Sequence, residues 1–363
     1  MMSFLKATTF AGIAATAVAS AAQSPPSADA PPPSPPPATK VQPPKAAPDM
    51  QKVLDALTAL NAKPVARLTP AAARVNPSAA DAAKKVMKDR GMPTAPDASV
   101  TTRDMAYGTD PQQFVRVYTP ASAKPGQMMP MIVYYHGGGW VIATVDTYDA
   151  APRLMAKSLD AVVASVEYRH APEAKFPAQH DDAAAAYRWV IDNAKSLGGD
   201  PTRLAVAGES AGGNLAVATA IHARDNKLTA PKHIVSIYPI ANSRMDLPSR
   251  KDSANAKPLD TAMLSWFGHY YGKTPADQQD PRINLVAANL RGLPPTTIIN
   301  AQIDPLRSDG ETLATAMRTA GVKVEQRTFP AVTHEMFGMG AIVKGAKEAN
   351  DYALGKLTAA LVK

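Results

Sequence analysis

The sequence predicts an α/β fold in which a mostly parallel sheet of about eight strands is flanked by helices. Two observations lead to this prediction. From about residue 99 onward, short runs rich in β-branched residues alternate with segments of helical length. Two of these runs lead directly into glycine-rich turns, at the strand ends where the sites of open α/β sheets collect. The length of 363 residues fits one large unit of this kind.

The expected strands are short and mostly separated by helical segments. The strands are residues 114–118, 131–135, 161–166, 204–207, 234–238, 296–300 and 322–329, and the helices are residues 178–196, 212–225, 306–320 and 342–361. Such alternation makes a parallel sheet with helices on both faces. The interval 241–293 is longer than a simple crossover and contains an amphipathic helix with Met263 and Phe267. We therefore expect an insertion above the sheet.

The first 98 residues have a different organisation. Residues 1–22 combine a short positively charged start, an apolar run of small residues and Ala-x-Ala sites, which is typical of a secretory signal peptide. This run is too short for a permanent membrane span, so we expect an exported protein, periplasmic or secreted. Residues 23–48 hold eleven of the 34 prolines and predict a linker without helix or strand. Residues 49–98 return to a helical pattern and predict two or three helices.

Composition and charge exclude several kinds of site. The chain has no cysteine, which rules out disulfides, thiolate zinc sites and a cysteine nucleophile. The net charge of +8 is spread thinly, and the densest basic group, within residues 84–90, has the spacing of a solvated helix face. We therefore expect no nucleic-acid partner. No histidine, aspartate or glutamate cluster has metal-binding spacing, so we expect neither a metal nor a cofactor.

The motif GESAGG, residues 208–213, lies where an expected strand leads into an expected helix. The pattern G-x-S-x-G needs glycine on both sides, because its serine sits in a strained turn where a Cβ would collide with backbone. Ser210 is therefore a candidate nucleophile. A glycine-rich turn without catalytic function is the alternative interpretation.

A second glycine-rich motif, HGGGW at residues 136–140, directly follows another expected strand. Consecutive glycines let backbone N–H groups approach a ligand closely, and two such donors can hold the oxyanion of a tetrahedral intermediate. A phosphate-binding loop is less well supported, because neither G-x-G-x-x-G nor G-x-x-x-x-G-K-[ST] is present. A purely structural turn also remains open.

A serine hydroxyl needs a base, and the base needs a carboxylate to orient it. His334 follows the last expected strand, and Asp304 follows the strand at 296–300. The order Ser210, Asp304, His334 is that of α/β hydrolases. Asp309 is the nearest rival of Asp304, but it falls in the following helix. The other candidate bases lie on or beside helices and are interpreted as ordinary histidines: His180, His222 and His233.

Five motifs in this order resemble those of the bacterial hormone-sensitive-lipase-like esterases. They are HGGGW at 136–140, YRHAPE at 168–173 with FPA at 176–178, GESAGG at 208–213, DPLR at 304–307 and THE at 333–335. The resemblance spans about residues 99–363 and implies an α/β-hydrolase catalytic domain with a cap insertion at about 241–293. Residues 49–98 take the position of that family's N-terminal cap helices.

The resemblance also implies roles for individual residues. Ser210 would be the nucleophile, His334 the general base and then acid, and Asp304 the group that orients His334. The oxyanion hole would be formed by three N–H groups, those of Gly137, Gly138 and Ala211. Trp140, Met263 and Phe267 are further candidates for binding the substrate.

Two positions depart from the family pattern. Glu335 replaces the glycine that commonly follows the catalytic histidine, and Ser308 stands where the family often has an acid. Neither change removes a catalytic group. The first places a carboxylate beside His334, where it could change the pKa of the base or the rim of the pocket.

The resemblance implies a serine carboxylic ester hydrolase that acts on a small-molecule ester through an acyl-enzyme intermediate and needs no cofactor. Short-chain acyl groups are expected, because the pockets of this family lie beneath a cap. Within hydrolases, the alternative is an amidase, or a deacetylase acting on an envelope polysaccharide or a xenobiotic ester. A non-catalytic binding module on the same fold is a remote alternative. The sequence does not indicate the oligomeric state.

Overall fold

The computed structural model describes residues 44–362. The expected signal peptide at 1–22 lies outside the described residues, as does all of the expected linker at 23–48 except its last five residues. The first described helix, α1, begins at Pro48. Within residues 44–362, no helix combines the length and the apolar character needed to cross a membrane.

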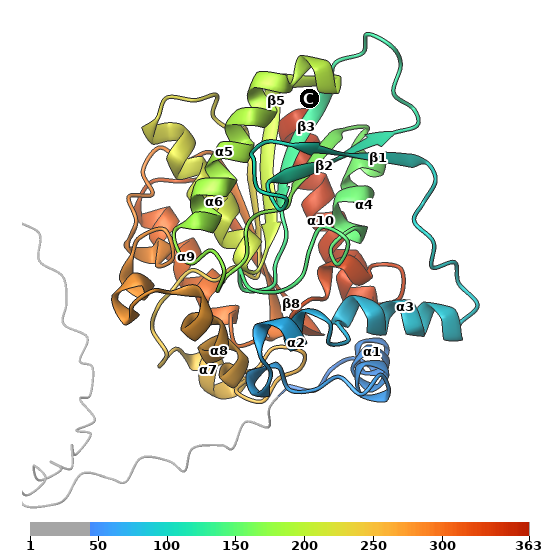
Figure 1. The fold of residues 1–363 in the computed structure, drawn as a ribbon, viewed down its shortest axis with the longest axis vertical. Coiled ribbons are helices and arrows are strands. Elements are labelled where there is room, and N and C mark those ends of the chain that lie inside the picture. The colour runs from blue at the N-terminus through green and yellow to red at the C-terminus, as the bar shows by residue number, and fades with distance from the viewer. Residues whose placement is uncertain (1–43, 363) are drawn as a thin grey trace, which may run out of the picture. The chain divides into compact units, whose positions relative to one another are not determined.

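A single eight-stranded sheet forms the centre of the described chain (Figure 1). Its order is β1-β2-β4-β3-β5-β6-β7-β8. The pairs β1/β2 and β2/β4 are antiparallel, and every other neighbouring pair is parallel. The strands are β1 Val100–Ala106, β2 Phe114–Pro120, β3 Met129–Tyr135, β4 Val162–Val166, β5 Gly199–Glu209, β6 Ile234–Ile237, β7 Thr296–Ile303 and β8 Val324–Thr333. The predicted mostly parallel sheet of about eight strands is confirmed.

The outermost strand, β1, is absent from the ranges that the sequence predicted. Its residues are mostly exposed and include Thr101, Thr102, Arg103 and Asp104, so the strand shows no apolar alternation. Pairing with β2 along its whole length holds it at the edge of the sheet. The two strands that precede the candidate acid and base also run further than predicted, since β7 ends at Ile303 and β8 at Thr333.

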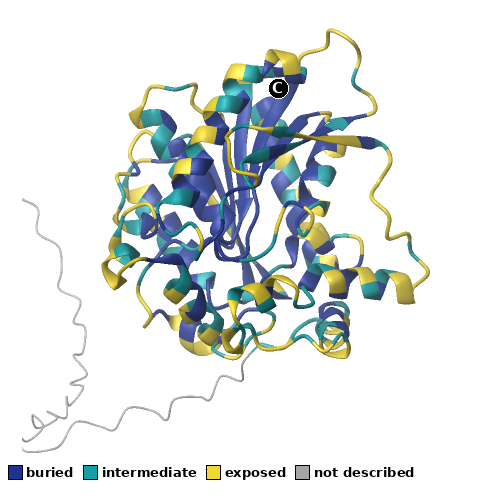
Figure 2. Ribbon diagram, in the orientation of Figure 1, coloured by how far each residue is buried: buried dark blue, intermediate teal, exposed yellow. Residues whose placement is uncertain are grey.

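Helices cover both faces of the sheet. Helices α5 Ala178–Asn193, α6 Ala211–Asp225 and α9 Arg307–Thr319 pack on one face, and their buried residues share an apolar core with that face. Helices α4 Ala150–Leu159 and α10 Lys344–Leu361 pack on the other. The central strands β3, β4, β6 and β7 are almost wholly buried, while the outward faces of the helices are exposed (Figure 2). Such two-sided burial explains why the central strands read as continuous apolar runs.

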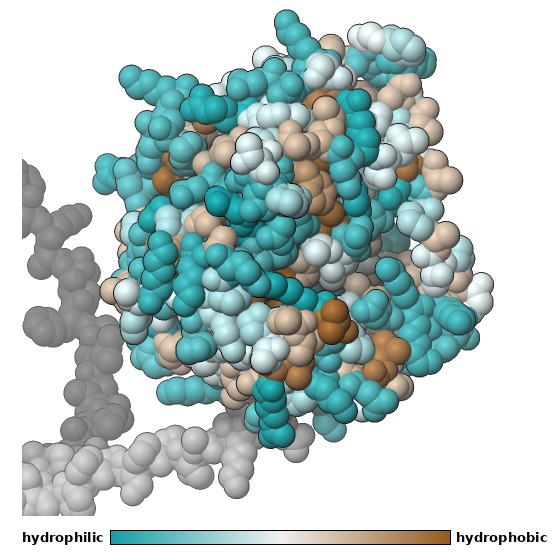
Figure 3. Space-filling model, in the orientation of Figure 1, coloured by the Kyte–Doolittle hydropathy of each residue, from teal (hydrophilic) through white to brown (hydrophobic). Residues whose placement is uncertain are grey.

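Five further helices gather at one end of the sheet, and we call this group the cap (Figure 1). They are α1 Pro48–Ala59, α2 Pro70–Arg74, α3 Ala79–Asp89, α7 Pro248–Asp252 and α8 Thr261–Tyr271. The first three come from the segment where two or three helices were expected, and the last two from the expected insertion. The Ser78 and Asp81 side chains form a capping box that fixes the start of α3. The visible face is largely hydrophilic, with small hydrophobic patches near α1 and α2 (Figure 3).

An arginine ties the cap to the loop after β4. The Arg74 guanidinium, at the end of α2, donates to both Glu173 carboxylate oxygens and to the carbonyl oxygens of Val141 and Ala171. Within the YRHAPE segment, Glu173 pairs with Arg74, and Arg169 pairs with Asp182 of α5. The YRHAPE segment therefore joins the cap, the glycine loop and α5.

Candidate active site

Ser210 occupies the sharp turn between β5 and α6. Its backbone has φ 58° and ψ −118°, a left-handed conformation that a residue with a Cβ rarely adopts. The turn is tight enough to exclude side chains beside it: a Cβ on Gly212 would lie 2.0 Å from the Tyr135 carbonyl oxygen. The G-x-S-x-G spacing thus presents the Ser210 hydroxyl at the carboxyl end of the central strand.

Two neighbouring strand ends bring a base and an acid to this serine. His334 directly follows β8, and its Nε2 lies 3.0 Å from Ser210 Oγ. Asp304 directly follows β7, and its Oδ2 lies 2.7 Å from His334 Nδ1. All three residues are buried: Ser210 is 5% exposed, His334 3% and Asp304 0%. In this arrangement the imidazole can accept the serine proton while the carboxylate holds Nδ1–H and stabilises the imidazolium.

Asp309, the rival of Asp304, is engaged elsewhere. Its carboxylate accepts hydrogen bonds from the backbone N–H groups of Ala241 and Asn242 and forms a buried ion pair with Arg250. Burial raises the pKa of Asp309 to about 6, against the opposing effect of Arg250. Asp309 therefore anchors the chain that follows β6, whereas Asp304 contacts the histidine.

The glycine loop after β3 presents backbone donors beside Ser210. Gly138 has φ +96°, and a Cβ there would lie 2.0 Å from the Ile142 carbonyl oxygen, so only glycine fits this turn. Among residues 44–362, no backbone group accepts a hydrogen bond from the N–H of Gly137 or Gly138. Ala211 is the first residue of α6, so its N–H has no partner within the helix. These donors suit an oxyanion.

A buried tyrosine holds the start of this loop. The Tyr168 hydroxyl donates to the His136 carbonyl oxygen at 2.9 Å, and the two rings stack with centroids 4.3 Å apart. His136 Nδ1 lies 2.8 Å from the Gly137 carbonyl oxygen. Both residues are buried. These contacts fix the direction in which the following N–H groups point.

Three buried side chains behind the loop could be considered as metal ligands. One ligand atom from each of His136, Glu167 and His170 lies within 4.8 Å of the other two. The sequence did not reveal this group, because β3/β4 pairing brings its members together. However, the Gln112 side-chain amide donates to His170 Nδ1, which leaves the proton on Nε2, facing Glu167 Oε1 at 3.4 Å. His170 thus presents an N–H, and not a lone pair, to the space between the three side chains. In this protonation state the group does not suit a metal ion.

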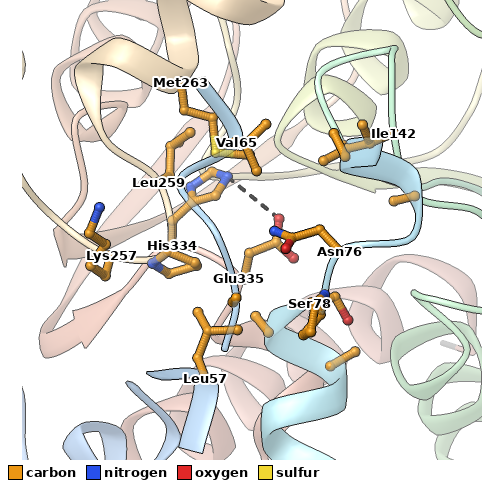
Figure 4. Close-up of a pocket in the computed structure, with 18 of the residues that line it drawn as sticks. Leu57, Val65, Asn76, Ser78, Ile142, Lys257, Leu259, Met263, His334 and Glu335 are labelled. Carbon is orange, nitrogen blue, oxygen red and sulfur yellow. Dashed lines mark ion pairs between the residues drawn. The ribbon is translucent and has the colours of Figure 1, made fainter. Parts of the chain in front are cut away.

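A cavity of about 400 Å³ lies between Ser210 and the cap. Met263 and Phe267 of α8 line it, as the sequence suggested, together with residues of α1 and α3 (Figure 4). Trp140, the third residue expected to bind substrate, is not among the residues that line this cavity. Its ring is buried and stacks on Tyr271, with centroids 4.2 Å apart. The positive φ of Trp140, 63°, accompanies this inward placement.

Glu335 and Tyr148 border the same cavity. The Tyr148 hydroxyl donates to Glu335 Oε1 at 2.6 Å, and this oxygen lies 4.0 Å from His334 Nε2 (Figure 4). The involvement of Tyr148 was not foreseen, since it lies in an irregular loop before α4 that carries no motif. Burial lowers the pKa of the His334 imidazole, but Asp304 first, and then Glu335 and Glu209, raise it above its ordinary value. The carboxylate at position 335 therefore favours the protonated base.

Replacing Glu335 with glutamine should move the acid limb of the kcat/KM profile to lower pH. The substitution removes the charge and keeps the shape, so the pKa of His334 falls and the neutral base persists in more acidic solution. A unit charge 4 Å away is worth about 1 kcal/mol in water-like surroundings, or roughly 0.7 pH units. The pH dependence of p-nitrophenyl acetate hydrolysis measures this shift. The control is Glu348→Gln, on α10, which should leave the acid limb at its wild-type pH. If Glu335→Gln also left the acid limb there, the conclusion that Glu335 raises the pKa of His334 would be contradicted.

The other candidate histidines have structural environments. His180 is buried, with Nε2 3.0 Å from Asn214 Oδ1 and Nδ1 2.9 Å from the Tyr271 hydroxyl. His233 lies 2.9 Å from Thr297 Oγ1, and burial lowers its pKa to about 4. His222 is on α6 and contacts Asn226. None of the three contacts Ser210 in the described part of the chain.

The fold and the Ser210, His334 and Asp304 geometry together define an α/β hydrolase. A family model described as "alpha/beta hydrolase fold" matches residues 132–338, which is more than half of the chain. With the motif series and the relatives below, the chain belongs to the hormone-sensitive-lipase-like esterases of this fold.

Two relatives and one solved structure illustrate the similarity. Carboxylesterase NlhH of Mycobacterium tuberculosis is 39% identical over 272 residues, which cover 73% of this chain and 84% of that protein. Ethyl acetate hydrolase of Pseudomonas putida is 37% identical over 254 residues, covering 69% and 78%. A hyperthermophilic esterase from the archaeon Pyrobaculum calidifontis has a TM-score of 0.75 at 33% identity, covering 87% of this chain and 98% of that one.

Proposed function

We propose that this carboxylesterase-type hydrolase cleaves short-chain acyl esters with Ser210 as its nucleophile. One observation carries the assignment: the hydrogen-bonded series from Ser210 through His334 to Asp304 opens into a cavity beside the N–H groups of the glycine loop. The names of two relatives, a carboxylesterase and an ethyl acetate hydrolase, support an ester substrate.

The reaction has two halves. Ser210 Oγ bonds to the ester carbonyl carbon while its proton passes to His334 Nε2, and the N–H groups of Gly137, Gly138 and Ala211 stabilise the resulting oxyanion. The carbon–oxygen bond to the alcohol then breaks, and His334 returns the proton to the departing alkoxide. In the second half, His334 takes a proton from water while the water oxygen bonds to the acyl carbonyl carbon. The bond from that carbon to Ser210 Oγ then breaks, and His334 returns the proton to Oγ, which releases the acid and regenerates the free serine.

The cavity supports a preference for short acyl groups. Its volume is about 400 Å³, and residues of the cap helices α1, α3 and α8 line it on the side opposite Ser210. We expect kcat/KM to fall steeply across p-nitrophenyl esters as the acyl chain lengthens from acetyl to palmitoyl, because longer chains leave the cavity. Initial rates on monomeric substrate measure this profile. Activity that rises toward palmitoyl would contradict the short-chain assignment and indicate a lipase.

Export is a separate proposal, supported by the composition of residues 1–22. Cell fractionation with N-terminal sequencing of the mature chain tests it. We expect to find the protein outside the cytoplasm. We expect the N-terminus of its mature chain to lie within a few residues after Ala19 or Ala21. Cytoplasmic protein that retains Met1 or Met2 would contradict export.

A further inference from the structure

Two cavities meet beside His334. The second, of about 660 Å³, lies between α3 of the cap and α4. Four residues line both cavities: Ala80, Thr147, Tyr148 and Glu335. The hydrogen bond from the Tyr148 hydroxyl to Glu335 therefore lies across the boundary between the cavity that contains Ser210 and the one that does not.

This boundary lies on the side of the leaving alcohol. His334 Nε2 must reach the leaving oxygen to return its proton, and Glu335 Oε1 is 4.0 Å from that nitrogen. Glu335 lies between His334 and the cap residues Asn76 and Ser78 (Figure 4). Tyr148 also lies beside the glycine loop, because its hydroxyl oxygen is 2.2 Å from the position that a Cβ on Gly137 would occupy. An alcohol group that extends past His334 meets this pair first.

The backbone at position 335 does not require a glutamate. Its φ of +68° is in the left-handed region, where glycine is unstrained and other residues are disfavoured. The side chain nevertheless projects to the cavity and is held there by Tyr148, which is itself buried. Beyond the pair, the second cavity is lined by two ion pairs, Arg116 with Asp146 and Arg153 with Asp149. The space behind the pair is thus already present in this structure.

We infer that the Tyr148–Glu335 pair limits the size of the leaving alcohol by closing the second cavity off from Ser210. The inference rests on the proposed ester hydrolysis and deepens it. Small alcohols fit on the Ser210 side of the pair, whereas bulky alcohols would need the space behind it. Glu335→Gly should open that space, because it removes the carboxylate and suits the backbone.

The test compares ethyl, benzyl and naphthylmethyl acetates, which share one acyl group, by titrating the acetic acid released. In Glu335→Gly, kcat/KM for naphthylmethyl acetate relative to ethyl acetate should rise at least about tenfold over the wild-type ratio, which is the scale on which a few atoms of pocket space change discrimination between substrates. Glu335→Gln is the matched control, because it keeps the volume and the hydrogen-bond acceptor, and its ratio should stay near wild type. Each variant is assayed on the plateau of its own pH profile.

Refilling the second cavity should reverse the effect. Ala95 is exposed and lines only the second cavity, so adding Ala95→Trp to Glu335→Gly should return the ratio toward wild type. An unchanged ratio in an active Glu335→Gly, or an equal rise in Glu335→Gln, would overturn the inference. If Glu335→Gly does not fold, Tyr148→Phe provides a second test, because it removes the hydroxyl that holds Glu335. This variant should also raise the ratio, and an unchanged ratio would overturn the inference. Failure of the proposed function would be recognised differently, because ethyl acetate hydrolysis would then continue without Ser210.

Discussion

Ser210→Ala should lower kcat/KM for p-nitrophenyl acetate by about 10⁴-fold or more. The substitution removes the oxygen atom that lies 3.0 Å from His334 Nε2 and that would form the acyl-enzyme bond. The residual rate would come from the oxyanion donors and from binding alone. Because alanine fits the same left-handed turn about as well as serine, the thermal midpoint should change little.

Ser253→Ala is the matched control. Ser253 is also a buried serine, its hydroxyl has no hydrogen-bond partner among the described residues, and it does not line the cavity. Its replacement should leave kcat/KM within about twofold of wild type. Wild-type turnover by Ser210→Ala, with purity verified by intact mass, would show that another residue forms the acyl-enzyme.

Asp304→Asn should lower kcat by about 10³- to 10⁴-fold without unfolding the protein. Asp304 Oδ2 accepts from His334 Nδ1, which keeps the lone pair of Nε2 toward Ser210. An asparagine amide can donate to Nδ1 and so favours the tautomer in which Nε2 carries the proton and cannot act as a base. The Oδ1 contact with the Leu306 N–H, 2.8 Å long, survives the change. The thermal midpoint should therefore remain near wild type.

Replacing Asp309, the neighbouring aspartate, should have the opposite effect, namely a loss of stability with little change in kcat. Asp309→Asn should destabilise the fold by about 3–5 kcal/mol, because it leaves the buried Arg250 without its counter-ion. The kcat of the folded fraction, counted by active-site titration, should stay within a few-fold of wild type. Thermal unfolding and single-turnover kinetics on both variants separate the two roles. If Asp309→Asn lost activity while Asp304→Asn kept it, the assignment of the orienting acid would be reversed.

The sequence predicted the parallel core from the local pattern of each buried strand, and it predicted the meeting of Ser210, Asp304 and His334 from their positions directly after such strands. Each of these residues follows a strand, and parallel strands place their carboxyl ends at one edge of the sheet. The edge strand β1 was missed because exposed polar residues carry no apolar period. The fold class could thus be predicted from the buried strands alone.

The surroundings of the site were less predictable, because they depend on tertiary contacts between distant segments. Trp140 adjoins the glycine loop in sequence, yet its ring turns inward onto Tyr271. Tyr148 reaches Glu335 across 187 positions of sequence, and Arg74 reaches Glu173 across 99. No periodicity or motif encodes such pairs. The shape of the pocket therefore emerges only once the cap is placed above the sheet.

The most direct test of the Ser210 mechanism is to label the protein with a fluorophosphonate and map the adduct by peptide mass spectrometry. A reactive phosphorus centre captures the serine that the base activates and mimics the tetrahedral intermediate. We predict one adduct per chain, on Ser210, formed in step with loss of esterase activity and absent from Ser210→Ala. Complete inactivation with the adduct on another residue, or full activity after stoichiometric labelling of Ser210, would contradict the mechanism.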